Sequence, residues 1–154
     1  MPINSIPISQ YGLRLPPQAS LKEALTLMLE KQVNHIAICE MNGRYVGILS
    51  TNAILHTLIP ASAKVSGGLS SLRFTGDAIR LLTAHLRDLE THQVGQFVNM
   101  SVPVMREDDP ILEAAKLLAD SSTPLPVIDK NGKFVGVLSR RALLAYLLAN
   151  EGEN

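Results

Sequence analysis

Two serines in this chain stand where an apolar run gives way to a helical pattern, a place where an anion can be held. Ser139 ends the run Phe-Val-Gly-Val-Leu-Ser, and Ser50 ends Tyr-Val-Gly-Ile-Leu-Ser. A strand that ends at a helix start presents the serine hydroxyl together with backbone N–H groups that have no partner within the helix. Arg140 and Arg141 follow Ser139 and add cationic donors, whereas the uncharged Asn52 lies near Ser50. The pattern therefore indicates a phosphate site, with Ser139 the better candidate.

The same serines have a purely structural interpretation, because serine is among the residues that most often cap a helix. In that case each hydroxyl accepts a hydrogen bond from its own helix and holds no ligand. Both interpretations stay open for Ser139. Gly47 and Gly136, each three residues before one of the serines, are better explained by close packing in a strand than by a ligand.

These residues belong to an internal repeat. The segment 43–50 reappears 89 positions later as 132–139, with glycine, a basic residue, an aromatic residue, valine, glycine, two apolar residues and serine in the same order. Upstream, a Glu-Ala pair at 23–24 matches another at 113–114. The sequence therefore predicts two copies of one structural unit.

Each copy is predicted to contain an extended piece, a helix, two strands joined by an Asn-Gly turn, and a closing helix. Ser20 and Glu23 form a capping box before the first helix, and Asp109 is expected to cap the matching helix of the second copy, with Pro110 in its first turn. The expected elements are extended pieces at 13–15 and 102–105, helices at about 21–32 and from 111, strands at 35–39, 45–49, 125–128 and 134–138, and closing helices after Ser50 and from 140 to about 150.

The doubled unit resembles a pair of CBS (cystathionine β-synthase) domains, the tandem arrangement called a Bateman module. The strand Leu125-Pro-Val-Ile-Asp129, the Asn-Gly hairpins and the two Gly-x-x-Ser segments carry the resemblance. It implies an α/β fold of the α+β type, in which two pseudo-twofold-related β-α-β-β-α repeats form one compact module. The expected boundaries are 8–58 for repeat one, 97–150 for repeat two, and 59–96 for a crossing segment with an amphipathic helix at about 77–91 and a Ser- and Gly-rich stretch at 60–75.

The resemblance also implies a ligand site, since such modules commonly bind adenine nucleotides or S-adenosylmethionine between the repeats, pair into homodimers and regulate an effector. A proline inside a strand indicates an edge or a strand end beside a cleft, with its carbonyl free for an adenine amino group. His35 stands where the family often has a basic residue near the phosphates, a half-buried structural histidine being the alternative. The candidate ligand-binding residues are Ser139, Arg140, Arg141, Ala142, Pro126, Val127, Ser50, Asn52 and His35.

One departure from the family bears on affinity. The family usually has an aspartate three residues after the serine, which takes both ribose hydroxyls, and this chain has Ala53 and Ala142 there. Hydrogen bonds to a carboxylate contribute ~1.5–3 kcal/mol each, so nucleoside binding is expected to be micromolar or weaker unless Asn52 or Arg141 substitutes. AMP, ADP, ATP and S-adenosylmethionine are the candidate regulatory ligands, and none is an obligatory cofactor.

Charge and composition remove several classes of partner. The 14 Lys and Arg residues balance the 14 Asp and Glu residues, which argues against nucleic acid. No apolar run reaches the ~18 residues of a membrane span, and the N-terminus lacks a signal-peptide pattern, so no membrane partner is expected. The lone Cys39 cannot form an internal disulfide, which fits the reducing cytoplasm.

No motif in the chain is typical of catalysis or metal binding. Phosphate-loop, nucleophile-elbow and zinc-protease motifs are absent from the sequence. His85 and His92 are expected to be solvated rather than to bind metal, and the acidic run 107–109 is expected to complement a helix dipole. The chain is therefore predicted not to be an enzyme.

Three classes of function remain, in decreasing order of support: a regulatory module that senses a small ligand, a ligand-free dimerisation or interaction module of the same fold, and an enzyme of unrecognised type. Because the chain holds only the two repeats, a signal is expected to pass to a separate effector protein. The closing helix of repeat two has more apolar surface than the other repeat can cover, so a homodimer is predicted. The leucines concerned are Leu143, Leu144, Leu147 and Leu148.

Overall fold

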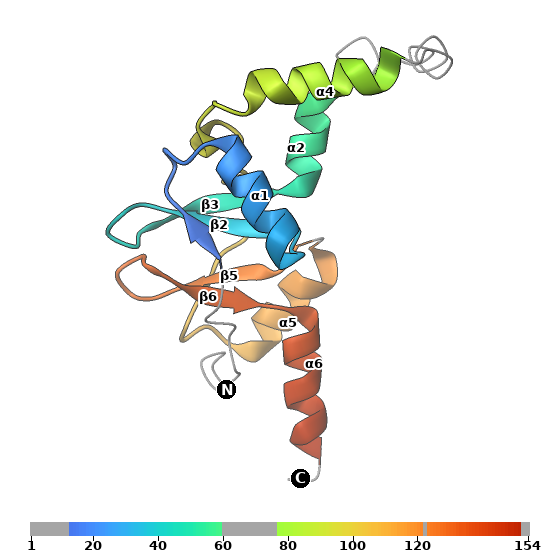
Figure 1. The fold of residues 1–154 in the computed structure, drawn as a ribbon. Coiled ribbons are helices and arrows are strands. Elements are labelled where there is room, and N and C mark those ends of the chain that lie inside the picture. The colour runs from blue at the N-terminus through green and yellow to red at the C-terminus, as the bar shows by residue number, and fades with distance from the viewer. Residues whose placement is uncertain (1–12, 60–76, 122, 152–154) are drawn as a thin grey trace.

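The computed structural model describes residues 13–59, 77–121 and 123–151 of the 154-residue chain (Figure 1), so the crossing predicted at 60–75 lies outside the described residues. The elements are β1 (Arg14–Leu15), α1 (Leu21–Lys31), β2 (His35–Cys39), β3 (Tyr45–Ser50), α2 (Thr51–Leu58), α4 (Asp77–Leu89), the 3-10 turn η3 (Val94–Gln96), β4 (Met105–Arg106), α5 (Ile111–Asp120), β5 (Leu125–Ile128), β6 (Phe134–Leu138) and α6 (Arg140–Ala149). The predicted helices and strands are all found, although the extended piece that opens each repeat is a strand of only two residues.

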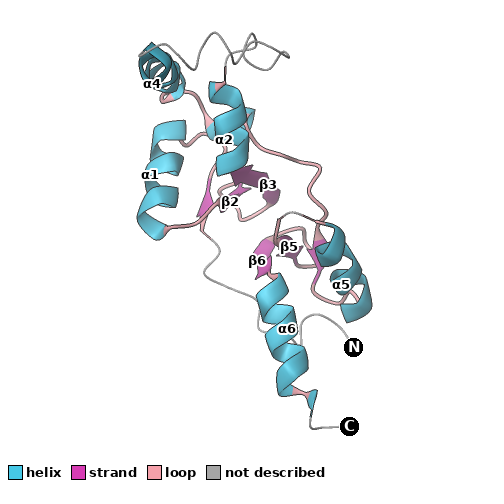
Figure 2. Ribbon diagram, turned by 90° about the vertical axis from the view of Figure 1, so that its right-hand side faces the viewer, coloured by secondary structure: helices cyan, strands magenta, loops and turns pink. Residues whose placement is uncertain are grey.

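The strands form two three-stranded sheets of identical topology, β1-β2-β3 and β4-β5-β6. In each sheet the first strand is parallel to the second, and the second is antiparallel to the third. The pairs Ile38–Gly47 and Val127–Gly136 are equivalent, and a register shift follows each of them. The region β1–α2, repeat one, and the region β4–α6, repeat two, are thus two copies of a β-α-β-β-α unit, as predicted (Figures 1 and 2).

Serine caps open three of the helices. Ser20 Oγ accepts the N–H of Glu23 at 3.1 Å, Ser50 Oγ accepts that of Ala53 at 3.0 Å, and Ser139 Oγ accepts that of Ala142 at 3.1 Å. Each bond satisfies one of the N–H groups that a helix start leaves unpaired. The predicted caps of α1, α2 and α6 are therefore confirmed.

The start of α5 differs from its prediction. Asp109 does not cap the helix, because its Oδ2 accepts the backbone N–H of Arg106 at 2.8 Å and closes the turn between β4 and α5. Pro110 takes the N-cap position without a side-chain hydrogen bond. The side chain of Asp109 prefers the nearer turn N–H, which is the usual competition between local Asx bonds and helix caps.

Three apolar clusters hold the described part of the chain together. The first belongs to repeat one and is completed by Leu86 and Leu89 of α4, and the second belongs to repeat two. The third lies between the repeats and contains Ala37, Cys39, Ile48, Val102 and Phe134. The repeats therefore share a core, which makes them one module rather than two independent domains.

The two hairpins meet at equivalent residues. Tyr45 N donates to Gly132 O at 3.1 Å, and Phe134 N donates to Gly43 O at 3.0 Å. The rings of Tyr45 and Phe134 stack with centroids 6.1 Å apart, and the Arg14 guanidinium lies 4.9 Å above the Phe134 ring. This reciprocal exchange of hydrogen bonds is the pattern that a twofold axis between the repeats produces.

A segment that enters repeat two is also bonded to repeat one. Ile48 N donates to Asn99 O at 3.2 Å, and Asn99 N donates to Ile48 O at 2.9 Å. A Cβ on the neighbouring Gly47 would lie 2.2 Å from Val98 Cγ1 and 2.8 Å from Asn99 O. The packing interpretation of Gly47 is therefore confirmed.

Candidate functional site

The strand-to-helix junction of repeat two gathers the residues for which the sequence predicts phosphate binding. Ser139 is half-buried, and Arg140 and Arg141 are exposed. Arg140 Nε donates to Leu118 O at 3.0 Å, which uses one of the five N–H donors of the guanidinium. The Ser139 hydroxyl accepts from its helix and still has its own proton to donate. Capping and phosphate binding are therefore compatible at this residue, and the junction has the donors that a phosphate needs.

The equivalent junction of repeat one is built from uncharged side chains. Ser50 faces His35 in register across β2 and β3, and Thr51 Oγ1 donates to Asn34 Oδ1 at 3.4 Å. Burial lowers the pKa of the half-buried His35, because a charged imidazole is disfavoured away from water. Asn52 is exposed. The two junctions share a backbone but differ in charge, and that of repeat two is better suited to an anion.

Pro126 and Val127 lie in β5, the middle strand of its sheet, so the sheet-edge alternative for the proline is wrong. The strand-end alternative fits, since Pro126 is the second residue of β5. The reason is the position of β4, which begins at Met105 opposite Val127 and leaves Pro126 one residue outside the paired stretch. The missing N–H of the proline therefore interrupts no pairing with β4. Both side chains are buried, so contact with a ligand at these residues falls to the backbone.

Ala53 and Ala142 occupy equivalent positions in the first turns of α2 and α6, where their N–H groups are bonded to the capping serines. Both are half-buried, and Ala142 packs against the core of repeat two. A methyl group offers no hydrogen-bond acceptor. The acceptors for the hydroxyls of a bound ribose must therefore come from other residues.

A pocket of about 300 Å³ lies next to the junction of repeat two. One wall is the segment before β4, and the other is the C-terminal end of α5 with the residues after it. We call it the boundary pocket, and it is lined by Asn99, Ser101, Val102, Pro103, Leu117, Asp120, Ser121 and Thr123. The same end of α5 supplies Leu118, the residue that binds Arg140. The pocket and the junction therefore share one end of this helix.

The polar residues of the boundary pocket are fixed by short-range hydrogen bonds. Asn99 Oδ1 accepts both the N–H and the hydroxyl of Ser101 at 2.9 Å. Ser121 Oγ donates to Thr123 O at 3.0 Å and accepts the N–H of Thr123 at 3.1 Å. With Asp120 as a carboxylate acceptor and apolar side chains beside these groups, the pocket can hold a flat apolar ring with polar substituents.

None of the candidate residues from the sequence lines the boundary pocket, whose polar residues the sequence reasoning missed. The available signals were the hydroxyl-rich run Ser121-Ser-Thr123 before β5 and the Asn-x-Ser spacing of Asn99 and Ser101. Both patterns are common in ordinary turns. The pairing of Asn99 with Ile48, which is remote in sequence, fixes that segment against β3 of repeat one.

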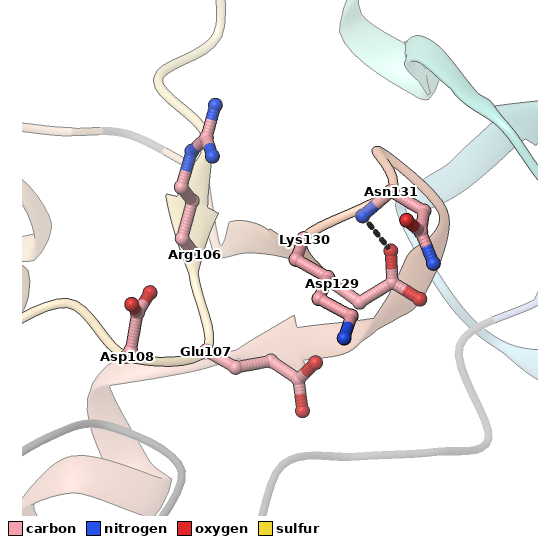
Figure 3. A pocket seen from close by; sticks show the side chains of 6 residues that line it. All are labelled: Arg106, Glu107, Asp108, Asp129, Lys130 and Asn131. Atoms are coloured by element: carbon pink, nitrogen blue, oxygen red, sulfur yellow. Dashed lines mark hydrogen bonds between the residues drawn. The ribbon is translucent and has the colours of Figure 1, made fainter.

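Two further pockets occupy equivalent places near the hairpin turns of the two repeats. The larger, about 440 Å³, is lined by Arg106, Glu107, Asp108, Asp129, Lys130 and Asn131 (Figure 3). Asp129 Oδ1 is occupied, since it accepts the N–H groups of Asn131 at 2.8 Å and Lys133 at 3.0 Å. The other, about 370 Å³, lies along Pro17, Gln18 and the turn 40–42. The first pocket is lined by charges of both signs, and Glu40 is the one charged residue that lines the second. We assign no ligand to either.

The described residues hold no cluster of three or more His, Cys, Asp or Glu side chains that suits a metal ion. His85 is half-buried and its Nδ1 lies 2.9 Å from Leu58 O, so the expectation that His85 is solvated is wrong. The ring is held there because α4 packs beside the end of α2. His92 is exposed, 6.4 Å from the ring of Phe97 between centroids. Across the described ranges no helix is long and apolar enough to cross a membrane.

Comparison with known families agrees with this architecture. The family model for the CBS domain matches residues 13–60 and 94–149, so the chain belongs to the CBS domain family. It is 27% identical over 143 residues to CBSX2, a chloroplastic CBS domain-containing protein of Arabidopsis thaliana, and 26% identical over 130 residues to CBSX1 of the same organism. The matches cover 90% and 80% of this chain but only 60% and 54% of those proteins.

Solved structures share the fold. CBSX2 of Arabidopsis thaliana, a CBS-pair protein, superposes with a TM-score of 0.76 at 22% identity, covering 99% of this chain and 97% of that one. CBSX2 in complex with AMP gives 0.69 at 23% identity, covering 97% and 98%. CbpB in complex with c-di-AMP gives 0.72 at 13% identity, covering 99% and 88%. The tandem CBS fold predicted from the repeated motif is therefore confirmed.

Proposed function

We propose that this CBS pair is a regulatory module that binds an adenine nucleotide, with the phosphate at the Ser139 junction and the nucleoside in the boundary pocket. The observation that carries the proposal is the hydrogen bond from Arg140 to Leu118, because it joins the anion-binding end of α6 to the α5 end that lines the pocket. Two solved CBS proteins with adenine nucleotides, CBSX2 with AMP and CbpB with c-di-AMP, support the ligand class.

The polarity of the proposed site gives the ligand one orientation. The N-terminus of α6, Arg140 and Arg141 attract the phosphate, whereas Asp120 and the C-terminus of α5 repel it. The Asp120 carboxylate can accept hydrogen bonds from ribose hydroxyls, and so replaces the acceptors that the methyl side chains of Ala53 and Ala142 lack. The nucleoside is therefore expected to lie on the α5 side and the phosphate on the α6 side.

The proposed output is regulatory rather than catalytic, through a homodimer and a separate effector protein in a reducing compartment such as the cytoplasm. Exposed leucines support the homodimer: Leu144, Leu147 and Leu148 of α6 are 64%, 48% and 71% exposed on a helix that extends away from both sheets (Figures 1 and 2). Leu143, grouped with them in the sequence prediction, is instead buried in the core of repeat two.

A second candidate is a ligand-free dimerisation module of the same fold. It is favoured by the methyl groups at Ala53 and Ala142 together with the exposed leucines of α6. The two candidates differ in what the protein carries when purified. Mass spectrometry of small molecules released by denaturation, followed by calorimetry with AMP, ADP, ATP and S-adenosylmethionine, distinguishes them. The absence of any heat at millimolar ligand would favour the ligand-free module.

A further inference from the structure

The two walls of the boundary pocket are attached to different repeats. The wall before β4 is paired with strand β3 of repeat one through the two hydrogen bonds between Ile48 and Asn99. Val102 of the same wall is buried in the cluster that Ile48 and Phe134 share between the repeats. The opposite wall, at the end of α5, belongs to repeat two. The shape of the pocket therefore depends on how closely its first wall is held to repeat one.

Gly47 is what permits that close approach. Ile38 is the register partner of Gly47 in β2. A Cβ added to Gly47 would collide with Val98 Cγ1 at 2.2 Å and with Asn99 O at 2.8 Å. The valine methyl can rotate away, but the carbonyl oxygen belongs to the backbone and accepts the N–H of Ile48 at 3.2 Å. Carbon and oxygen atoms need more than 3 Å between them. Any side chain at this position therefore pushes the wall outward and weakens the pairing.

Asn99 transmits the position of the backbone to the pocket itself. Its main chain is bonded to Ile48, while its Oδ1 accepts both the N–H and the hydroxyl of Ser101 at 2.9 Å. Ser101 and Asn99 are both pocket residues. A displacement of Asn99 therefore moves two polar groups that face the ligand space, without any change in repeat two.

We propose that Gly47 and Asn99 are positioning residues through which repeat one sets the shape, and hence the affinity, of the boundary pocket. This inference rests on the proposed nucleotide function for its ligand but not for its geometry. Gly47 contacts no ligand in this scheme. Binding in the pocket and the pairing of β3 with the wall are then coupled, and the coupling acts in both directions.

The first test is the affinity of the Gly47→Ala variant for AMP, measured by calorimetry. We expect a loss of roughly tenfold, the usual size of a coupling between sites. The matched control is Gly132→Ala, a strained substitution at φ +80° with no atom within 4 Å of the added Cβ, which should lower stability but leave AMP affinity unchanged. Equal affinities for Gly47→Ala and the wild type would overturn the proposal.

A second variant covers the case in which Gly47→Ala does not fold. Asn99→Ala keeps the backbone pairing with Ile48 and removes the bonds to Ser101, so it should weaken AMP without adding a steric clash. In the wild type, AMP should also slow hydrogen exchange of the Ile48 amide more than that of the Tyr45 amide, which donates to Gly132 across the other contact between the repeats. If the exchange rate of the Ile48 amide is the same with and without bound AMP, the coupling is contradicted.

A third measurement needs no ligand and separates this proposal from the nucleotide function. Val102 is 8% exposed, so a Val102→Cys thiol should react slowly with a disulfide reagent at pH 8. In a Gly47→Ala background the lifted wall should expose this thiol and speed its labelling, whereas Gly132→Ala should not. Cys39, the only cysteine of the sequence, lies in the same cluster as Val102, so all these variants are made in a Cys39→Ser background in which residue 102 carries the only thiol. If the labelling rate is unchanged in Gly47→Ala, the positioning role is refuted even if AMP binds. If labelling is faster but AMP does not bind, only the nucleotide assignment is refuted.

Discussion

Ser139→Asp separates the two roles of the serine that caps α6. Aspartate caps helices as well as serine does, and its charge is favoured at a helix N-terminus, so the bond to Ala142 N can be kept. The melting temperature should stay within about 2 °C of the wild type. A carboxylate in place of the hydroxyl, however, repels the phosphate, because both groups are negatively charged. This one substitution should therefore weaken AMP binding while leaving stability nearly unchanged.

The size of the binding loss follows from the geometry of the cap. Two unit charges 4 Å apart repel by about 4 kcal/mol at an effective dielectric constant of 20. Ser139 is half-buried and two exposed arginines stand beside it, so screening reduces this to about 2 kcal/mol, or roughly a 30-fold loss of AMP affinity. Ser139→Ala, by contrast, should cost ~1 kcal/mol of stability through the lost cap.

Calorimetry with AMP and thermal unfolding of the same preparations provide the assay. Ser20→Asp is the matched control, since Ser20 caps α1 with the same geometry and is remote from α6 in sequence and in the fold. It should leave AMP affinity unchanged. A folded Ser139→Asp protein that binds AMP as tightly as the wild type would show that the phosphate does not lie at the start of α6.

Three further outcomes are expected. Ala142→Asp should raise the preference for AMP over 2′-deoxy-AMP about tenfold, because a carboxylate accepts from both ribose hydroxyls, and an unchanged ratio in calorimetry would place the ribose elsewhere. Light scattering at micromolar concentration should give a dimer mass for the wild type and a monomer mass for the double variant Leu144→Ser with Leu148→Ser, and a monomeric wild type would contradict the dimer. Burial raises the pKa of Cys39 from 9.0 to about 11, so its proton is held more tightly in the folded state, and this contribution to stability is present below pH 9 and lost as the pH rises to 11. Urea unfolding at the two ends of that range should show a larger decrease for the wild type than for Cys39→Ser.

Local signals in the sequence were sufficient for the repeat, the strands and the serine caps. The Gly-x-x-Ser segments, the Asn-Gly turns and the Ser20 capping box each depend on residues within four positions of one another. Asp109 shows the limit of such signals. Its carboxylate could accept from the N–H groups at the start of α5 or from the N–H of Arg106, and in the structure it accepts from Arg106. Pro126 shows another, since its tolerance in a middle strand depends on where β4 happens to begin.

The boundary pocket could not be predicted from the sequence for a different reason. Its first wall is positioned by the pairing of Asn99 with Ile48, 51 residues away in the chain, and no periodicity in either segment encodes that contact. Gly47 was assigned to packing from its place in a strand, but its partner Val98 was not foreseen. Leu143 likewise follows the spacing of its exposed neighbours on α6 and yet is buried, because the first turn of that helix is still covered by repeat two.

The hairpin contact between the repeats has a consequence for assembly. Tyr45 and Phe134 each donate one bond to a glycine carbonyl of the other hairpin, so the contact is isologous, with like surfaces facing each other within one chain. Such a contact does not distinguish a chain's own second repeat from that of a neighbouring molecule, which is the condition for domain swapping. The unlike contacts, Arg14 over the Phe134 ring and Val98 beside Gly47, distinguish repeat two from a second copy of repeat one, but they do not distinguish one chain from another. Pairing within a single chain is then favoured by the covalent connection, which holds repeat two at a high effective concentration beside repeat one.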